Sequence, residues 1–352
     1  MKIDVRLEPA DLRDSGSSAA QLELGGYDGL WTPELAHDPF LPLALAAVST
    51  TTVDVGTAIA VALARNPMTL AVVADDLQRM SQGRFILGLG SQIRPHIERR
   101  YSMPWSQPVE RMRELVLAVR AVWSAWSDGS ALDVRGAFYT HTLMTPVFDP
   151  GPNPFGPPKI YLAVVGERMA EVAGEVADGV FVHSFTTERY LRERLLPAVH
   201  RGLAKAGRSA SELEICLPGF VATGLDEQQL SAAVEATRGQ IAFYASTPTY
   251  RPVLELHGWG DLQTELHALA GSGRADRWEV MGTRIDDDVL EAVALVGEPE
   301  QVGRSLPARF EGLIDRFSFT KGPAGPDLPW PALIATTAAV GARARTTDGQ
   351  EL

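Results

Sequence analysis

The amino-acid sequence predicts an α/β fold, a (β/α)8 TIM barrel with insertions. Short β-rich runs alternate with longer helical runs through about 320 of the 352 residues. Strands separated by helices run parallel, because each return crossover requires a helix, and eight such units make up this barrel. The length fits one large barrel domain, whereas two average domains and a doubly wound open sheet are the alternatives.

The strands are recognised as short apolar or alternating runs that end at turn residues. They are expected at 2–7, 29–34, 53–62, 85–92, 159–165, 179–185, 214–223 and 314–319. The helices are expected at 17–24, 41–49, 66–80, 108–126, 168–177, 188–206, 226–245 and 298–310. Pro67 stands in the first turn of the third helix, where its missing N–H costs nothing. In the fourth helix six apolar residues share one face at helical spacing: Met112, Leu115, Val116, Val119, Val122 and Trp123.

Two segments interrupt this alternation. Residues 127–158 contain six prolines and a short alternating piece at Val134–Tyr139, which predicts an excursion with a small hairpin. Residues 246–288 form a second excursion, rich in Gly, Trp and His, and a Pro/Gly-rich and then Ala-rich tail begins at about residue 322. We therefore expect one barrel domain over 1–352 that carries both excursions.

Composition excludes several classes of function. Lys and Arg total 32 and Asp and Glu total 44, so the formal charge is 32 − 44 = −12. Nucleic acids and anionic membranes both require a cationic surface, so neither is an expected partner. No run is long and apolar enough to span a membrane, and the N-terminus lacks an apolar signal core. With Cys216 as the single cysteine, no disulfide framework is possible and the cytoplasm is the expected compartment.

Barrel chemistry belongs at the C-terminal ends of the strands. The fifth strand ends in Val164, Val165, Gly166, Glu167 and Arg168. A glycine before a helix start lets a phosphate approach the free backbone N–H groups of the first turn, and Arg168 would add positive charge. A plain strand-to-helix turn is the alternative.

The fourth strand ends in GLGSQ at 88–92. It begins like a dinucleotide fingerprint, but the third glycine is missing, so the motif is weak support for NAD. Gly90 and Ser91 would instead let a flat ring lie close to the backbone. The alternative is that the glycines only relieve crowding inside the barrel.

Glu34, His37 and Asp38 follow the second strand. A carboxylate and an imidazole together can transfer protons, so Glu34 and His37 are candidate catalytic residues. A surface histidine, and a turn or helix cap at Asp38, are the alternatives.

Other chemistries have little support in the sequence. The seven histidines form neither H-x-H nor H-E-x-x-H, so no metal site is expected. There is no G-x-S-x-G elbow. Lys321, after the last strand, is a candidate Schiff-base lysine of an aldolase, although a solvated lysine before a glycine turn is the favoured explanation. The aromatic stretch 244–260 predicts an ordered lid or interface, or else a packed crossover.

In their order along the chain, five motifs resemble the bacterial luciferase-like monooxygenase superfamily, and within it the coenzyme F420-dependent oxidoreductases. They are GYDGLWTPE in the region 25–34, VDVGTAIAVALARNPMTLA, QRMSQGRFILGLGSQ, AGEVADGVFVHSF and VGEPEQV. The resemblance implies a barrel with a flavin-type ring at its C-terminal mouth. It implies a cis peptide at Ala58–Ile59 against which the ring rests, and a strand-two carboxylate at Glu34. It also implies phosphate-binding amides from Val164 to Arg168, with Gly90 and Ser91 beside the ring.

The chain departs from the sugar-phosphate dehydrogenases of this group. Leu35 stands where they have a histidine, and Ile93 stands where they have an acid. A sugar phosphate is therefore not the expected substrate. The proton donor remains open among His37, Asp38, His96, Tyr250 and His257.

The resemblance thus predicts hydride transfer between coenzyme F420 and a small organic substrate. An FMN-dependent monooxygenase and a catalytically silent cofactor-binding homologue are the alternatives. A polyanionic cofactor tail would need a local basic patch in this acidic chain, and Arg94, Arg99 and Arg100 are candidates. Barrels of this kind pair through outer helices, so a homodimer or a higher homo-oligomer is expected.

Overall fold

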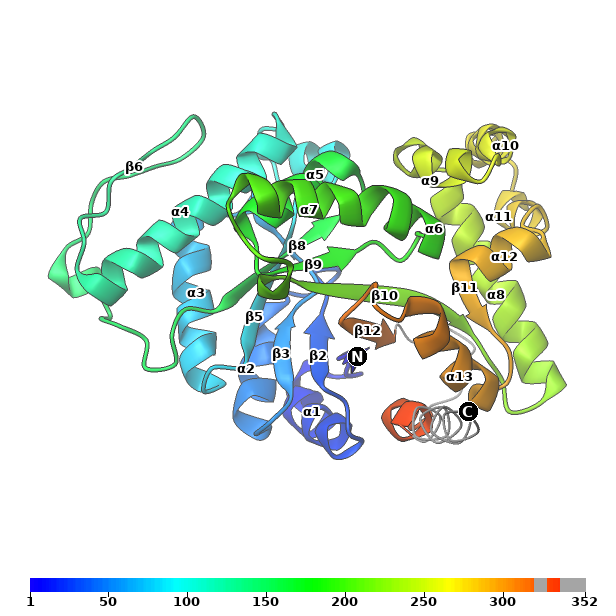
Figure 1. Ribbon diagram of the computed structural model, residues 1–352, viewed down its shortest axis with the longest axis horizontal. Coiled ribbons are helices and arrows are strands. Elements are labelled where there is room, and N and C mark those ends of the chain that lie inside the picture. The colour runs from blue at the N-terminus through cyan, green and yellow to red at the C-terminus, as the bar shows by residue number, and fades with distance from the viewer. Residues whose placement is uncertain (320–327, 336–352) are drawn as a thin grey trace, which may run out of the picture. The chain divides into compact units, whose positions relative to one another are not determined.

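The computed structural model describes residues 1–319 and 328–335 (Figure 1). The chain divides into two compact units. The first unit comprises Asp4–Phe181 and Pro197–Ile215, and the second comprises Met1–Ile3, Val182–Leu196 and Cys216–Leu352. Among the described residues, no helix combines the length and the apolar character needed to cross a membrane.

The first unit is built on a parallel sheet. Its strands are β1 (Lys2–Arg6), β2 (Gly29–Thr32), β3 (Asp54–Thr57), β5 (Phe85–Gly90), β8 (Lys159–Val164) and β9 (Gly179–Val182), which are neighbours in this order. The connecting helices are α1 (Ser15–Leu24), α2 (Phe40–Ser49), α3 (Pro67–Met80), α4 (Pro108–Asp128) and α5 (Glu167–Val176). In Figure 1, β2, β3 and β5 lie side by side, and α2 and α3 pack on them. Strand β2 is fully buried, as expected of a sheet covered on both faces.

The second unit continues the alternation. Strand β10 (Glu214–Ala222) pairs in parallel with β11 (Ala294–Val296) and β12 (Arg316–Phe319). Its helices are α6 (Glu188–Tyr190), α8 (Glu227–Ala245), α9 (Arg251–Leu256), α10 (Gly260–Ala270), α11 (Arg277–Gly282), α12 (Asp287–Val293) and α13 (Pro299–Phe310). Figure 1 shows α9, α10 and α11 in yellow next to α8, on which α10 and α11 pack.

The eight predicted strands are therefore present, and the fold is the predicted (β/α)8 barrel. The third predicted strand, 53–62, is interrupted: β3 ends at Thr57 and a two-residue strand, β4 (Ala60–Val61), resumes the pairing with β5. The predicted helix 188–206 consists of α6, a π-helical turn at Leu191–Leu195 and α7 (Leu196–Lys205).

The first excursion contains the predicted hairpin. Strands β6 (Val134–Arg135) and β7 (Thr140–His141) pair antiparallel. The carboxylate of Glu114 on α4 accepts three backbone N–H groups of the turn, from Ala137 (2.9 Å), Phe138 (2.7 Å) and Tyr139 (2.6 Å). Arg111, also on α4, donates Nε to the Tyr139 hydroxyl (3.0 Å), so two side chains of α4 anchor the hairpin.

The second excursion is more regular than its composition suggests. Between residues 246 and 288 the chain forms α9, α10, α11 and the start of α12, which are short helices separated by glycines. Strand β11 was not predicted, because it has only three residues. Lys321 lies outside the described residues. In the described part of the tail, Trp330 stacks on Phe319 with ring centroids 4.5 Å apart.

Candidate active site

Glu34 is the centre of a hydrogen-bond network at the end of β2. Its Oε2 accepts the backbone N–H of Val61 (2.7 Å) and Nη1 of Arg65 (2.5 Å), and its Oε1 accepts the hydroxyl of Tyr101 (2.8 Å). Only 7% of its side chain is exposed. With three donors on two oxygens, one of them from a cationic partner, the carboxylate is held in place as a hydrogen-bond acceptor.

The same residue shapes the interruption between β3 and β4. The Ala58–Ile59 peptide bond is cis, as the resemblance implied. The N–H of Ala58 donates to the carbonyl of Thr32 (2.8 Å), and the N–H of Glu34 donates to the carbonyl of Ile59 (3.2 Å). Glu34 thus holds the bulge through its backbone N–H at Ile59 and through its carboxylate at Val61.

Small residues on β5 let this bulge lie close to the strand. A Cβ atom on Gly88 would lie 1.8 Å from the carbonyl oxygen of Thr57, so only glycine fits there. A Cβ atom on Gly90 would lie 2.7 Å from the tip of the Ile59 side chain, which therefore rests on Gly90. Crowding inside the sheet explains Gly88. At Gly90 the space of a side chain is filled by Ile59, and Ser91, which directly follows, is half-buried.

The segment after β5 is anchored to the segment after β2. Gln92 (φ 60°) and Ser102 (φ 55°) adopt the left-handed conformation on either side of a π-helical turn at His96–Arg100. Both features recur at functional sites. The turn places Tyr101 on Glu34. Burial raises the pKa of the Tyr101 phenol, and its hydrogen bond to Glu34 raises the pKa further.

The structure separates the two other candidates that follow β2. Asp38 accepts the N–H of Phe40 (2.8 Å) in the turn before α2, whose N-cap is Pro39, and pairs with Arg65 (3.2 Å). Arg65 therefore links Asp38 to Glu34. His37 is exposed, and no hydrogen-bond partner is found for it in the described part of the chain. The Glu34 network does not include His37.

The predicted phosphate site lies between β8 and α5. Val164 is buried at the strand end, and Val165 and Gly166 lead into the helix. Gly166 is the N-cap, no side chain caps the first turn, and a Cβ atom on Gly166 would meet nothing within 4 Å. A side chain at position 166 would therefore enter open space beside the start of α5. Arg168 is exposed and pairs with Glu110.

Glu167 adds a negative charge to this first turn, which by itself opposes an anion. Arg201 of α7 lies 3.3 Å from the Glu167 carboxylate and offsets that charge. Arg201 was not predicted, because it lies 34 positions away from Glu167 in the chain.

A second cluster lies in the second unit, directly after β9. The backbone N–H of Phe185 donates to Nδ1 of His183 (3.0 Å), and Nε2 of His183 lies 2.9 Å from the Tyr250 hydroxyl. Burial lowers the pKa of His183 to about 4. Burial, together with Tyr244, raises the pKa of Tyr250 to about 12. Both groups are neutral at pH 7.

His257 belongs to the same unit but has a different environment. Its Nε2 lies 2.8 Å from the hydroxyl of Thr187, which also caps α6, and its ring stacks on Trp259 at 4.5 Å. Burial lowers the pKa of His257, and Arg189 lowers it further. The aromatic stretch thus packs as ordered structure around two histidines. His96, the remaining candidate, is exposed.

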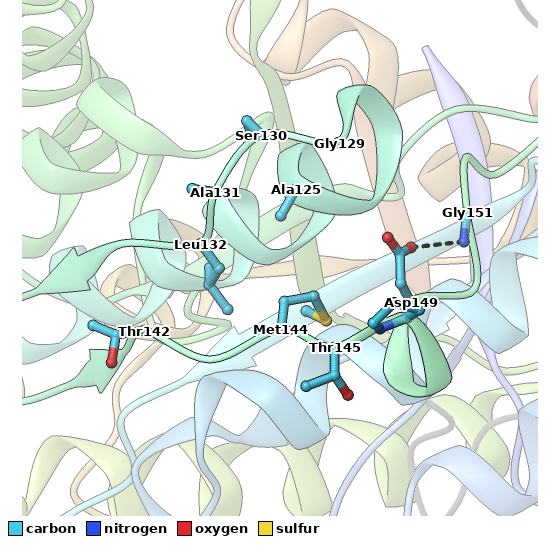
Figure 2. A pocket seen from close by; sticks show the side chains of 11 residues that line it. Ala125, Gly129, Ser130, Ala131, Leu132, Thr142, Met144, Thr145, Asp149 and Gly151 are labelled. Carbon is cyan, nitrogen blue, oxygen red and sulfur yellow. Dashed lines mark hydrogen bonds between the residues drawn. The ribbon is translucent and has the colours of Figure 1, made fainter.

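A surface groove of about 500 Å³ lies elsewhere in the first unit (Figure 2). It runs between the end of α4 and the segment that follows β7. Figure 2 shows its one acidic side chain, Asp149, turned back to accept the N–H of Gly151 (2.8 Å). None of the predicted site residues lines this groove. Across residues 1–319 and 328–335, no cluster of three or more His, Cys, Asp or Glu is arranged to hold a metal ion.

The chain is similar to known proteins over most of its length. The luciferase-like monooxygenase family model matches residues 3–316. The uncharacterized protein Rv1360 of Mycobacterium tuberculosis is 53% identical over 316 residues, which cover 90% of this chain and 92% of that protein. The 5,10-methylenetetrahydromethanopterin reductase of Methanolobus tindarius is 26% identical over 299 residues, 83% of this chain and 84% of that enzyme.

Among solved structures, the coenzyme F420-dependent tetrahydromethanopterin reductase of Methanopyrus kandleri has the same fold. It superposes with a TM-score of 0.75 at 21% identity, covering 96% of this chain and 97% of that one. The family model and the mycobacterial relative each span most of the sequence. The chain belongs to the luciferase-like monooxygenase family.

Proposed function

We propose that the protein is an oxidoreductase that transfers a hydride between coenzyme F420 and a small organic substrate. The observation that carries the proposal is the Ile59–Gly90 surface on β3–β5, next to a strand, β8, whose following helix has an uncapped first turn. A flat ring and a phosphate need these two features together. When bound, the deazaflavin supplies a carbon that gives or takes a hydride.

The residues of the first unit fit such a cofactor. The Ile59 side chain offers an apolar face, and Glu34 fixes the bulge that presents it. The first turn of α5, which Gly166 begins without a capping side chain, and the N–H of Arg168 are where a phosphate would bind, beside the open space at Gly166. Because both oxygens of Glu34 are already occupied, we assign it to positioning the bulge, and proton transfer by Glu34 or His37 is the alternative.

The preference for F420 over FMN rests on two observations. The Methanolobus tindarius relative is a reductase, and the structurally similar Methanopyrus kandleri enzyme is F420-dependent. In addition, the π-helical turn carries Arg99 and Arg100 in a chain of net charge −12. Arg94 pairs with Glu98 and Arg100 binds the carbonyl of Leu35, whereas no partner of Arg99 is found among the described residues. Arg99 is thus available for an anionic tail.

A paired titration tests the cofactor. Apoprotein is titrated with F420 and with FMN, with quenching of the seven tryptophans as the signal. Arg99→Glu is measured beside Arg304→Glu, which makes the same charge change at an exposed position on α13. We expect tight F420 binding and weak FMN binding in the wild type. Arg99→Glu should weaken F420 binding about tenfold at low salt, with FMN unaffected, while Arg304→Glu has little effect.

Each other outcome selects an alternative. A preference for FMN would assign the protein to the monooxygenases, with oxygen as co-substrate. Tight F420 binding without turnover of any hydride acceptor would support the catalytically silent homologue. Binding of neither cofactor would contradict the site built on Gly90 and Gly166.

We further propose a cytoplasmic enzyme that acts as a homodimer or larger homo-oligomer. The single cysteine, Cys216, is buried and free, which suits a reducing compartment. The apolar outer face of α2 supports self-association, and its test is described below.

A further inference from the structure

We propose that residues 91–107, which join β5 to α4, form a strap that opens to admit the cofactor and closes over it, with the Tyr101–Glu34 hydrogen bond as its latch. The inference rests on the proposed function, because the molecule to be admitted is the anionic deazaflavin. All the residues that carry it belong to the first unit. Tyr101 is thereby assigned as a positioning residue.

The path of the strap crosses the surface proposed for the ring. The strap leaves β5 at Gly90, and its far end is bound to Glu34 and Leu35, which follow β2. Strand β3 lies between β2 and β5 in the sheet (Figure 1). Because neighbouring strands are about 4.8 Å apart, the strap spans roughly 10 Å across the end of β3. A flat ring on Ile59, in the bulge that follows β3, would therefore lie beneath the strap.

Two side chains hold the strap in this position. The hydroxyl of Tyr101 donates to Oε1 of Glu34 (2.8 Å), and Nη2 of Arg100 donates to the carbonyl of Leu35 (2.7 Å). The Arg100 guanidinium also lies 4.9 Å from the centre of the Tyr101 ring. Water competes for the exposed Arg100, whereas the Glu34 carboxylate is almost fully buried. The Tyr101–Glu34 hydrogen bond is therefore the stronger part of the latch.

Away from the latch, the strap has little contact with the rest of the fold. Of residues 91–107, only Ile97 is buried. The backbone hydrogen bonds of the strap are largely internal, such as those from the N–H of Tyr101 to the carbonyl of His96 (3.0 Å) and from the N–H of Met103 to the carbonyl of Ile97 (3.0 Å). A segment with few buried residues and its own hydrogen bonds can detach as a unit at low free-energy cost.

Strained backbone marks both ends of the strap. Gln92 (φ 60°) directly follows the Ser91 that ends the run of β5, and Gln107 (φ 39°) directly precedes α4. Ser102 (φ 55°) lies just beyond Tyr101. Left-handed conformations are unfavourable for residues with a side chain and recur in switch regions. Hinges are a few loop residues that absorb such backbone changes, so these three positions are suited to that role.

The charges of the strap favour closure over an anion. Arg94 is paired with Glu98, but no partner of the exposed Arg99 is found among the described residues. Attraction between Arg99 and the anionic tail of the cofactor would add to the latch once the cofactor is in place. A closed strap would then slow dissociation, as loops that cover a bound ligand do.

Hydrogen–deuterium exchange on the full apoprotein tests the latch without any cofactor. Tyr101→Phe keeps the ring and removes the donor, so amides 96–103 should exchange at least about fivefold faster than in the wild type. Tyr161→Phe is the matched control, because it removes another phenol that donates to a carboxylate, that of Glu214, in the same unit. Its strap should exchange as in the wild type.

Stopped-flow mixing with F420 tests the gate. A latch that restricts both entry and exit slows both, so Tyr101→Phe should raise the association and the dissociation rate constants by about threefold or more each. Kd should then change less than either rate constant. Bound F420 should also slow exchange of amides 96–103 in the wild type. Tyr161→Phe should keep both rate constants within about twofold of the wild type.

The outcomes separate this inference from the proposed function. If F420 does not bind the wild type, both fail, whatever the exchange of the strap. If F420 binds but Tyr101→Phe leaves strap exchange unchanged, Tyr101 is not a latch and the cofactor assignment stands. If the strap of Tyr101→Phe opens but F420 associates no faster, the strap is not a gate. A slower association with Tyr101→Phe would make Tyr101 a fixed part of the binding surface.

Discussion

The carboxylate of Glu34 accepts donors from three separate segments, at Val61, Arg65 and Tyr101. Glu34→Gln preserves the shape but replaces one acceptor oxygen with a donor that faces an existing donor. We expect a loss of about 1–3 kcal/mol in the free energy of unfolding, and F420 binding weakened at least tenfold because the bulge shifts. Urea unfolding and the cofactor titration measure the two effects.

A matched control is Glu193→Gln, which removes an exposed carboxylate paired with Arg189. Its effect on unfolding should be below about 0.5 kcal/mol. If Glu34→Gln retains normal cofactor affinity and stability but loses turnover, Glu34 transfers a proton and the positioning role is wrong.

At the scale of elements, Glu23 at the end of α1 holds the segment between α2 and β3. Its carboxylate accepts the N–H groups of Thr51 (2.9 Å), Thr52 (2.6 Å) and Val53 (3.0 Å). Burial raises the pKa of Glu23, but these hydrogen bonds outweigh it and lower the pKa from 4.5 to about 2. Because the pKa of Glu23 is lower in the folded than in the unfolded protein, its ionised carboxylate stabilises the fold at pH values above the unfolded-state pKa. This stabilisation is lost as the pH falls from about 4.5 toward about 2.

We therefore expect Glu23→Gln to cost about 1–2 kcal/mol at pH 7, a value reduced for solvent screening. The difference in the free energy of unfolding between the wild type and Glu23→Gln should shrink as the pH falls from about 4.5 toward about 2. Urea unfolding at pH 7, 4 and 3 measures it. Glu227→Gln, at an exposed first-turn position of α8, should show no pH-dependent gap. A gap for Glu23→Gln that stays constant with pH would contradict this account.

Strands and helices whose apolar residues follow a regular spacing could be predicted from the sequence. The strand at 85–90 and the helix at 108–128 follow from apolar runs and helical spacing. The cis peptide at Ala58–Ile59 was predicted only from the resemblance to the family. The periodicity of residues 53–62 is that of a continuous strand. The helices within 246–288 were not predicted because each is short and lies next to glycine or proline. Such a local pattern is typical of a loop.

The candidate site was predictable residue by residue but not as a network. Glu34, Gly90 and Gly166 stand at strand ends, where the barrel places its chemistry. Arg65 and Tyr101 were missed because they reach Glu34 across 31 and 67 positions, and spacing along the chain carries no sign of such contacts. His37, which the sequence placed next to Glu34, faces solvent.

At the scale of the whole molecule, the outer face of α2 predicts self-association. Leu41 (63% exposed), Leu45 (42%) and Val48 (63%) share this face at helical spacing. A symmetric dimer would bury the same stripe on both copies. Leu45→Glu should convert the dimer to a monomer in light scattering after size exclusion, whereas Leu225→Glu, at an equally apolar exposed position, should not. A wild-type monomer would overturn the prediction.

Two side chains of α4 anchor the β6–β7 hairpin, and both lie outside the barrel strands. Glu114 accepts three N–H groups of the turn, Arg111 donates to the Tyr139 hydroxyl, and the exposed Arg135 stands in β6. Glu114→Ala combined with Arg111→Ala should therefore let the hairpin open locally while the barrel stays folded. Trypsin should then cut after Arg135 many times faster than in the wild type at unchanged melting temperature, so the insertion behaves as an independently opening unit that evolution can lengthen, exchange or remove.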